Sequence, residues 1–272
     1  EPIYGNANLN PEKTVTYELG LQQQLTETVA FNVTGFYKDV RDLLKQKKIR
    51  ISSNSIYQKY VNKDYGNIKG ITFSFTKRKM PDDLFGASLD YTFQVAEGNE
   101  TGADAFFIDL QSGRQSEKTP VPLDWDQSHT LNGVITFGGD RDWTVTLVTS
   151  LGTGLPYSPE LTEQQIYLRT NSGRKPLQTN VDLLIDKSFM IESTTLTIFL
   201  KVFNLFDTKN ERFVYDDTGR ATYSLEQTKG GPEATNEISK IYPEIKSATE
   251  YFNRPNYYSA PREVRLGLTI EY

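Results

Sequence analysis

Residues 14–24 read TVTYELGLQQQ, and this short stretch decides the class of fold. Apolar side chains stand at the odd positions from Val15 to Leu21, with polar or small residues between them. A period of two is typical of a β-strand with one apolar face. After a polar turn at 25–28 the alternation continues through residues 29–38, so we predict a hairpin.

The same alternation recurs along the rest of the chain. Further strands are predicted near residues 71–76, 88–95, 131–137, 143–148, 181–186, 196–203 and 263–272. The count is about nine strands, with no convincing helix. Residues 236–252 have some helical character, but Pro243 interrupts them, and we interpret this segment as part of a long loop.

The connections alternate between short and long. Short turns are expected near 25–28, 79–86, 138–142 and 190–194, whereas long polar links are expected near 42–55, 97–127, 152–178 and 206–260. Long structureless loops are uncommon in compact soluble domains. Strict alternation is instead typical of a transmembrane barrel, with short periplasmic turns and long extracellular loops.

Composition excludes several other classes of protein. No apolar run approaches the roughly 18 residues of a membrane-spanning helix. A net charge of −5 argues against a general nucleic-acid binder. The chain has no cysteine and a single histidine, His129, which leaves little material for a thiolate site, a metal centre or side-chain catalysis. We therefore predict no enzyme activity, no catalytic residue, no cofactor and no metal site.

The polar faces of the strands carry charged residues, which fits a wall between lipid and a wet interior. We predict that these charged side chains face the lumen: Glu18, Lys38, Asp90, Asp182, Lys201 and Arg265. An odd number of strands leaves open sheet edges, and unpaired backbone groups in hydrocarbon cost several kcal/mol each. The chain is therefore expected to be part of a larger barrel.

Three motifs in order resemble TonB-dependent outer-membrane receptors. Residues 8–21 (NLNPEKTVTYELGL) resemble the family's Asn-Leu-x-Pro-Glu and Tyr-Glu-x-Gly signature. Residues 201–207 (KVFNLFD) resemble its penultimate strand, and residues 260–272 (APREVRLGLTIEY) are similar to its last strand with an aromatic terminus. The sequences of residues 124–130 and 217–220 are most similar to those of receptors of the Bacteroidota type.

The resemblance implies an all-β fold in which residues 1–272 form the C-terminal portion of a transmembrane barrel of about 22 strands. It places the plug domain, the TonB box and the earlier strands outside this chain. It also implies a location in the outer membrane of a Gram-negative bacterium, as a multi-pass β-barrel. The implied partners are the lipid bilayer, the remaining strands and plug, the TonB complex and the barrel-assembly machinery. A surface lipoprotein is a further possible partner.

Several residues are candidates for binding or assembly. Five residues of the long loop could contact a ligand, although solvent-exposed side chains without a binding role are the simpler interpretation. They are Arg212, Tyr215, Arg220, Tyr242 and Tyr251. The resemblance assigns an assembly signal to Leu268, Ile270 and Tyr272. We interpret Asp124, Asp126 and His129 as a turn before a strand, because a metal site needs three or more convergent ligands.

The leading hypothesis is an active transporter that imports a scarce solute through a plug-gated barrel. The sequence leaves the solute open among siderophores, vitamins, oligosaccharides and peptides. An unplugged porin-like or adhesive barrel is the alternative among membrane proteins. A secreted soluble β-sandwich or carbohydrate-active domain is the alternative from another class, and it requires a second apolar face to bury.

Overall fold

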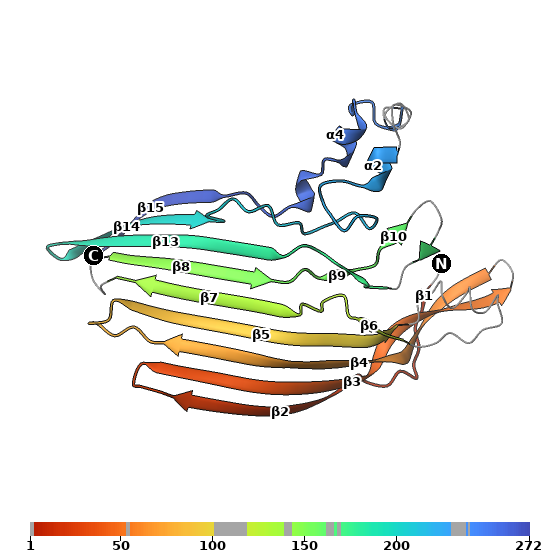
Figure 1. The fold of residues 1–272 in the computed structure, drawn as a ribbon, viewed down its shortest axis with the longest axis horizontal. Helices are drawn as coiled ribbons and strands as arrows, with labels where there is room; N and C mark the ends of the chain where they lie inside the picture. The colour runs from red at the N-terminus through yellow and green to blue at the C-terminus, as the bar shows by residue number, and fades with distance from the viewer. Residues whose placement is uncertain are drawn as a thin grey trace.

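The fold is a single large antiparallel sheet with loops gathered at one end (Figure 1). The computed structural model describes residues 3–52, 55–100, 119–138, 143–161, 166–167, 170–229, 238 and 240–272. Nine strands follow one another in chain order across the sheet. They are β2 (Lys13–Gln24), β3 (Val29–Ser52), β4 (Ser55–Lys77), β5 (Phe85–Glu100), β7 (His129–Phe137), β8 (Trp143–Gly152), β13 (Gln178–Ile191), β14 (Thr194–Phe203) and β15 (Glu263–Glu271).

The smaller elements lie along the long connections. Two of them join the main sheet: β1 (Ile3–Tyr4) pairs in parallel with β4, and β6 (Thr119–Pro122) pairs with β5. The others are β9 (Pro156–Tyr157), β10 (Glu160–Leu161), β11 (Ile166–Tyr167), β12 (Gly173–Arg174), α2 (Leu225–Lys229), α4 (Ala248–Phe252) and the 3-10 turn η1 (Pro255–Tyr257). Among the residues described, no helix has the length and apolarity that crossing a membrane requires.

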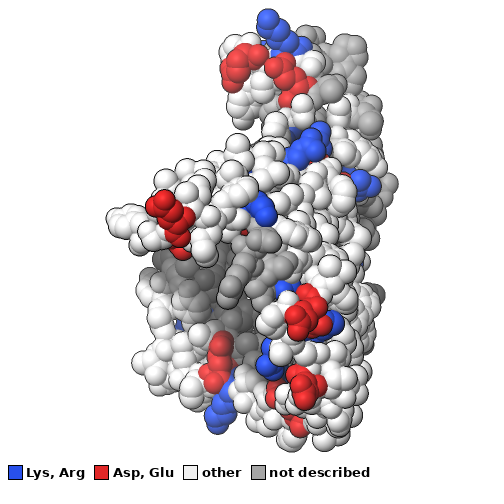
Figure 2. Space-filling view, turned by 90° about the vertical axis from the view of Figure 1, so that its left-hand side faces the viewer, with Lys and Arg blue, Asp and Glu red and all other residues white. Residues whose placement is uncertain are grey.

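The predicted up-and-down order of about nine antiparallel strands is confirmed. Short turns lie together at the left of Figure 1, beside the C-terminus, and the long connections lie at the right. Seen from the turn end, the molecule is a curved wall with a hollow on one side (Figure 2). Acidic and basic side chains are interspersed on this end and form no large patch of one sign.

One predicted loop is a strand hairpin. We expected a long polar link near 42–55, but β3 runs to Ser52 and β4 begins at Ser55. The pairing of β3 with β4 has a bulge at this point: it shifts by one residue between Val40 and Leu43 and shifts back between Leu43 and Leu44, and Asp42 adopts a left-handed φ of 60°. Beyond the bulge, residues 45–48 read KQKK, so this part of the strand lacks the apolar and polar alternation that a period-two pattern requires.

The long loop at 206–260 also contains more structure than expected. Within its described residues it forms α2, α4 and η1, so the prediction of no helix is wrong for these short segments. Helix α4 lies inside residues 236–252, which we had interpreted as loop, and part of that segment is outside the described residues. Five-residue helices are too short to show a period of 3.6, so the pattern could not reveal them.

Pairing across the sheet separates an apolar from a polar face. One row of paired residues runs Leu21, Val33, Phe73, Tyr91, Leu131. A row on the opposite face runs Thr34, Thr72, Thr92, Thr130. Because successive side chains of a strand point to opposite faces, each strand contributes to both kinds of row.

The apolar face is not packed against other protein. Leu19 is 84% exposed and Leu266 is 76% exposed. Among the described residues the buried hydrophobic side chains are only Ala96, Val121, Val202, Ala221 and Phe252. A soluble β-sandwich buries the inner faces of two sheets against each other, and this sheet has no such partner among the described residues.

The hydrogen-bonded rows are staggered, as strand tilt in a barrel requires. The row that starts at Phe85 continues through Phe137 and Ile185 to Leu266. Phe85 and Phe137 are the residues of β5 and β7 nearest the turns, whereas Leu266 lies well inside β15, which ends at Glu271. Each row therefore climbs away from the turns as it crosses the sheet.

The first of the three sequence motifs anchors β2 to the bulge. Pairing of β2 with β3 stops at Lys13 and Arg41. Beyond it, Glu12 Oε1 accepts the backbone N–H of Leu44 at 3.0 Å. Asn10 N–H donates to Asn62 Oδ1 at 2.7 Å, and Asn62 Nδ2 donates to the Asn10 carbonyl at 3.0 Å. The motif supplies partners for backbone groups that the sheet leaves unpaired at this point.

The second and third motifs form one joint between β14 and β15. Asn204, at a φ of 51°, donates through Nδ2 to the carbonyls of Thr208 and Ala260 at 3.1 and 3.0 Å, and its Oδ1 accepts Thr208 N–H at 2.8 Å. Asp207 Oδ1 accepts the N–H of Arg262 at 2.9 Å. The Asn-Leu-Phe-Asp and Pro-Arg segments thus hold each other, although Asp207 and Arg262 are 55 positions apart in the sequence.

Candidate functional site

Three of the five predicted loop contacts belong to one aromatic cluster at the loop end. The ring of Tyr215 lies 5.7 Å from that of Phe252 and 5.2 Å from that of Tyr257, measured between centroids. Tyr242 and Tyr251 pack at 5.7 Å, and Tyr251 packs edge-on to Phe252 at 5.1 Å. The structure therefore brings Tyr215, Tyr242 and Tyr251 together, and their rings form a small core for the loop itself.

The hydroxyl of Tyr215 is hydrogen-bonded within this cluster. Its hydroxyl donates to the carbonyl of Phe252 at 2.8 Å. Burial raises the pKa of the Tyr215 phenol above its ordinary value, because the phenolate loses hydration. The phenol stays protonated at neutral pH and acts as a hydrogen-bond donor.

Sequence reasoning missed Arg254, which completes this cluster. Its guanidinium carbon lies 5.2 Å from the ring centroid of Tyr251 and 5.6 Å from that of Tyr257, within range of a cation–π interaction. Arg254 also lines a small cavity of about 240 Å³ whose described wall carries the carboxylates of Glu160, Asp216, Asp217 and Glu226. The sequence signal was an arginine next to several tyrosines, which is too common to single out.

Arg220, another predicted contact, is engaged in an ion pair. Its Nη2 donates to Glu211 Oε1 at 2.6 Å, and its Nε donates to the same oxygen at 3.1 Å. Glu211 Oε2 also accepts the backbone N–H of Ala221 at 2.5 Å. Burial alone would raise the pKa of Glu211, but these hydrogen bonds outweigh it and the pKa lies below the ordinary value. Arg220 therefore fixes the path of its own loop.

Arg212 lines a polar cavity, while its backbone N–H donates to the carbonyl of Tyr257 in the aromatic cluster at 2.8 Å. The cavity measures about 530 Å³ and is formed on the polar face of β7, β8, β13, β14 and β15. Its described lining is Gln127, Thr130, Asn132, Ser150, Leu151, Gly152, Gln178, Thr179, Asn180, Asp182, Phe203, Asn204, Asn210, Arg212, Ser259, Ala260, Pro261 and Glu263. Arg212, the carboxylates of Asp182 and Glu263, and several amides and hydroxyls line this cavity, and such groups can bind a polar solute.

Asp182 is the one predicted lumen residue that lines this cavity, and it also supports the joint. Its Oδ1 accepts the N–H of Asn204 and the Nδ2 of Asn180, both at 2.8 Å. The other predicted lumen residues share its face by register, and that they line a wet lumen stays a prediction: Glu18, Lys38, Asp90, Lys201 and Arg265.

Cations on the polar face cover phenyl rings two residues away. Lys38 Nζ lies 5.4 Å from the ring centroid of Phe36, and Lys201 Nζ lies 4.8 Å from that of Phe199. The Phe199 ring in turn covers Gly267 on β15, where a Cβ would lie 2.2 Å from it. Phenylalanines on this face therefore fill the space above glycines and carry a charge on their outer side.

Asp126 and His129 do not converge on a metal. Asp126, only 1% exposed, pairs with Arg174 and accepts the N–H of Ala96 at 2.7 Å. His129 Nδ1 lies 2.8 Å from the hydroxyl of Tyr91, and the two rings stack. Within the described part of the chain, no group of three or more candidate ligands is placed to hold a metal ion.

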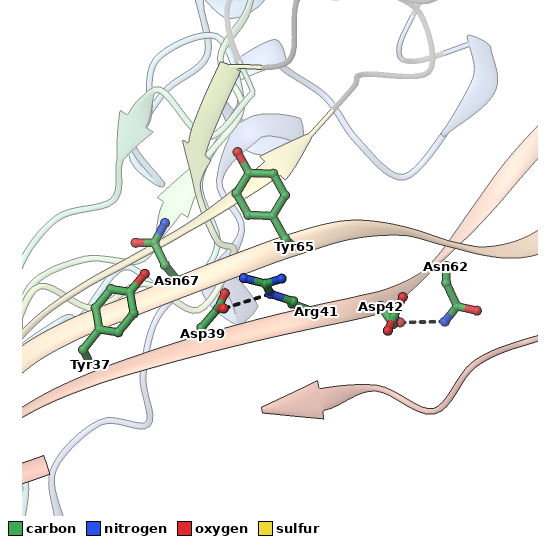
Figure 3. A pocket seen from close by; sticks show the side chains of 7 residues that line it. All are labelled: Tyr37, Asp39, Arg41, Asp42, Asn62, Tyr65 and Asn67. Atoms are coloured by element: carbon green, nitrogen blue, oxygen red, sulfur yellow. Dashed lines mark hydrogen bonds and ion pairs between the residues drawn. The ribbon is translucent and has the colours of Figure 1, made fainter. Parts of the chain in front are cut away.

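A second concavity, about 480 Å³, opens near the bulge of β3 (Figure 3). Tyr37, Asp39 and Arg41 belong to the same side of β3 as the apolar residues, so this concavity lies on the outer wall. Arg41 Nε donates to Asp39 Oδ2 at 2.9 Å, and Asn62 Nδ2 donates to the Asp42 carbonyl at 2.7 Å. The Arg41 side chain is 73% exposed, so this is a surface ion pair next to the bulge.

The residues of the expected assembly signal lie at the turn end of β15. Leu268 and Ile270 are exposed on the apolar face of this edge strand, and Tyr272 follows its last residue. Ile270 pairs with Leu196 of β14. Their role in assembly stays a prediction.

Comparisons with known proteins agree with this geometry. The family model described as "TonB dependent receptor-like, beta-barrel" matches residues 1–205. Among solved structures, a mutant of the ferric enterobactin receptor PfeA from Pseudomonas aeruginosa has a TM-score of 0.57 at 14% identity, covering 98% of this chain and 32% of that one.

Two further receptors give similar values. The ferric-catecholate import receptor Fiu from E. coli has a TM-score of 0.53 at 15% identity, covering 79% of this chain and 26% of that one. The FrpB iron transporter from Neisseria meningitidis has a TM-score of 0.53 at 14% identity, covering 76% and 29%. At these identities the likeness shows the fold alone. The chain spans less than a third of the length of each of these proteins.

Proposed function

Since the chain belongs to the TonB-dependent receptor family through its β-barrel domain, we propose that it is the C-terminal wall of a receptor that imports a scarce solute across the outer membrane. The observation that carries the proposal is the two-faced sheet. Its apolar face is exposed over all nine strands, while its polar face carries the 530 Å³ cavity. A wall of this kind separates hydrocarbon from an aqueous passage.

The loops supply the receptor part of the proposal. The aromatic cluster around Tyr215 and the polar cavity beside Arg212 both lie at the end of the sheet away from the short turns. We assign this end to the cell exterior, where a solute would first meet the protein. In our proposal a plug domain and a TonB box in other parts of the protein gate the passage and couple it to TonB. No catalytic step is proposed.

Similar structures include receptors for iron chelates, as their names state. At 14–15% identity they do not select a solute for this chain. Siderophores, vitamins, oligosaccharides and peptides are all compatible with a barrel of this type. Contacts with the barrel-assembly machinery through Leu268, Ile270 and Tyr272, and with a surface lipoprotein through the loops, belong to the same proposal.

The test is transport by the full-length receptor in a Gram-negative host. Labelled candidate solutes are offered to cells that carry or lack the receptor gene, with and without a protonophore. We expect receptor-dependent uptake that the protonophore abolishes, because TonB-coupled import needs an energised inner membrane. Uptake that is insensitive to the protonophore would support the porin-like alternative, and recovery of the protein in the soluble fraction would contradict both.

A further inference from the structure

A row of mostly uncharged polar side chains crosses the polar face of the sheet. By register it runs through seven strands, at Gln22, Asn32, Ser74, Asp90, Asn132, Ser150 and Asn180. The neighbouring row, two residues nearer the loops, carries Thr34, Thr72, Thr92 and Thr130. Asp90 is the one charged residue in these two rows, although 24% of the chain is charged. This part of the polar face therefore offers amides and hydroxyls, which both donate and accept hydrogen bonds.

The first of these rows links the two ends of the wall. Asn180 is the third residue of β13 counted from the loop end, whereas Gln22 is two residues from the turn end of β2 (Figure 1). At the loop end of the row, Asn132, Ser150 and Asn180 line the polar cavity of about 530 Å³. A solute in this cavity thus contacts a row of polar groups that continues toward the turns.

Other side chains of the cavity wall are occupied in holding the loops. The carboxamide of Asn210 bonds to the N–H and the carbonyl of Thr179, at 2.9 and 2.7 Å. Gln178 Nε2 donates to the carbonyl of Glu211 at 2.8 Å. These hydrogen bonds join the start of β13 to the long loop, and they give the cavity a rim that is already formed.

Three polar side chains in the same wall are available to a ligand. The carboxamide of Asn132, the hydroxyl of Ser150 and the guanidinium of Arg212 make no hydrogen bond or ion pair with the described part of the chain. All three residues are exposed. Asn132 and Ser150 are direct neighbours across β7 and β8, so their donors and acceptors lie side by side.

The charges around the cavity balance one another. Arg265 Nε donates to Glu263 Oε1 at 2.6 Å, which pairs one carboxylate of the lining with a cation. Arg212 and Asp182 are then the remaining cation and carboxylate of the described lining. A wall with no excess of positive charge does not attract a polyanionic metal chelate.

The spacing of the row distinguishes a sugar chain from a peptide. Neighbouring strands lie about 4.8 Å apart, so the row presents one polar side chain per about 4.8 Å. An extended peptide laid across the strands directs backbone groups to one side only at every second residue, a repeat of about 6.6 Å. A hexose unit of a linear glycan is roughly as long as the strand spacing. Successive hexose units therefore meet successive side chains of the row.

We propose that the polar cavity binds a neutral oligosaccharide, with Asn132, Ser150 and Arg212 hydrogen-bonded to its hydroxyls, and that the row guides it along the wall toward the turns. This inference rests on the proposed function and names the imported solute as a neutral glycan.

The binding test uses the full-length receptor in detergent and three neutral probes, maltotetraose, cellotetraose and mannotetraose. We expect at least one probe to bind. Combining Asn132→Ala with Ser150→Ala should weaken that binding at least about tenfold, because two hydrogen bonds are lost. The double variant should melt at the wild-type temperature, since neither side chain bonds to the described part of the chain.

The matched control combines Ser88→Ala with Thr144→Ala. It removes two hydroxyls from the same face, nearer the turns and outside the cavity, and it should bind the probe as wild type does. Added NaCl should leave binding of the neutral probe unchanged, because salt screens charges and the ligand has none. Wild-type affinity in the Asn132 and Ser150 double variant, binding of none of the neutral probes, or tighter binding of tetragalacturonate or tetra-alanine would overturn the inference.

Uptake by cells tests the row itself. Gln22→Leu combined with Ser74→Val changes the row outside the cavity, so it should leave binding unchanged and reduce the rate of glycan uptake. Unchanged uptake in this variant would overturn the guiding role of the row.

The protonophore distinguishes this inference from the proposed function. Protonophore-sensitive import of another solute, without binding of a neutral glycan, refutes the glycan site and leaves the transporter in place. Glycan binding with uptake that is insensitive to the protonophore refutes coupling to TonB and leaves the glycan site in place.

Discussion

Asn204 shows how one residue can hold two strands in place. Replacing it with alanine removes its bonds to Thr208 and Ala260, and it forces alanine into a left-handed φ of 51°. We expect Asn204→Ala to cost about 2–4 kcal/mol of unfolding free energy. Asn204→Gly should cost about 1 kcal/mol less, because glycine adopts this φ without strain.

The measurement is electrophoresis of samples heated to a series of temperatures. It gives the temperature at which the compact, fast-migrating form of the folded barrel is lost. Exposed Lys209 provides the control, and Lys209→Ala should stay within about 0.5 kcal/mol of wild type. Equal melting of Asn204→Ala and wild type would show that the joint between β14 and β15 contributes nothing to stability.

The Glu211 and Arg220 pair predicts acid sensitivity in the long loop. The folded pKa of Glu211 is depressed, so the pair contributes stability above the ordinary glutamate pKa of about 4.3 and loses it as pH falls through the folded value. We expect the loop to become more susceptible to protease below about pH 4.3, and Glu211→Gln to show the same susceptibility at pH 7. Pepsin suits the acid arm and a neutral protease the other. A flat response of wild type with pH would contradict this account.

At the scale of single residues, the sequence drew attention to the right loop residues but did not reveal their contacts. Tyr215, Tyr242 and Tyr251 were named as ligand contacts, which stays a prediction, and the structure places all three in one aromatic cluster. Arg220 was named for a ligand but is paired with Glu211, nine positions away on the same irregular loop. Such pairing depends on the three-dimensional path of the loop, which has no periodic signal.

At the scale of the element, adjacent leucines on β13 test the two faces. Leu183 pairs with Leu147 and Val202 on the apolar face, whereas Leu184 pairs with Thr146 and Lys201 on the polar face. Leu183→Arg should cost about 2–4 kcal/mol in a bilayer. Leu184→Arg should cost far less, because Asp182 and Asp186 flank it on the same face. Refolding into lipid vesicles under urea measures both, and equal costs would refute the assignment of faces.

Strands were predictable because their period is local, and the exceptions have local causes. The bulge at Asp42 and the all-polar residues 45–48 hid the parts of β3 and β4 that lie nearest the loop end. Phe36 and Phe199 place large apolar rings on the polar face, against the alternation. They lie instead over Gly70 and Gly267, on neighbouring strands that only the register of the sheet could identify.

At the scale of the whole molecule, the sheet has a large exposed apolar face and two free edges among its described strands, β2 and β15. Unpaired edges and exposed apolar surface both favour association with other chains. We expect residues 1–272, produced alone in buffer without detergent, to aggregate and to show no cooperative melting transition. The full-length receptor in detergent should be monodisperse and melt cooperatively, because in our proposal its other strands cover these edges and detergent covers the apolar face. Light scattering measures the association and calorimetry measures the melting. A 1–272 fragment that is stable, monomeric and cooperatively melting in plain buffer would mean that the apolar face is buried within the chain. That result would refute the proposal that this sheet is a membrane-spanning wall.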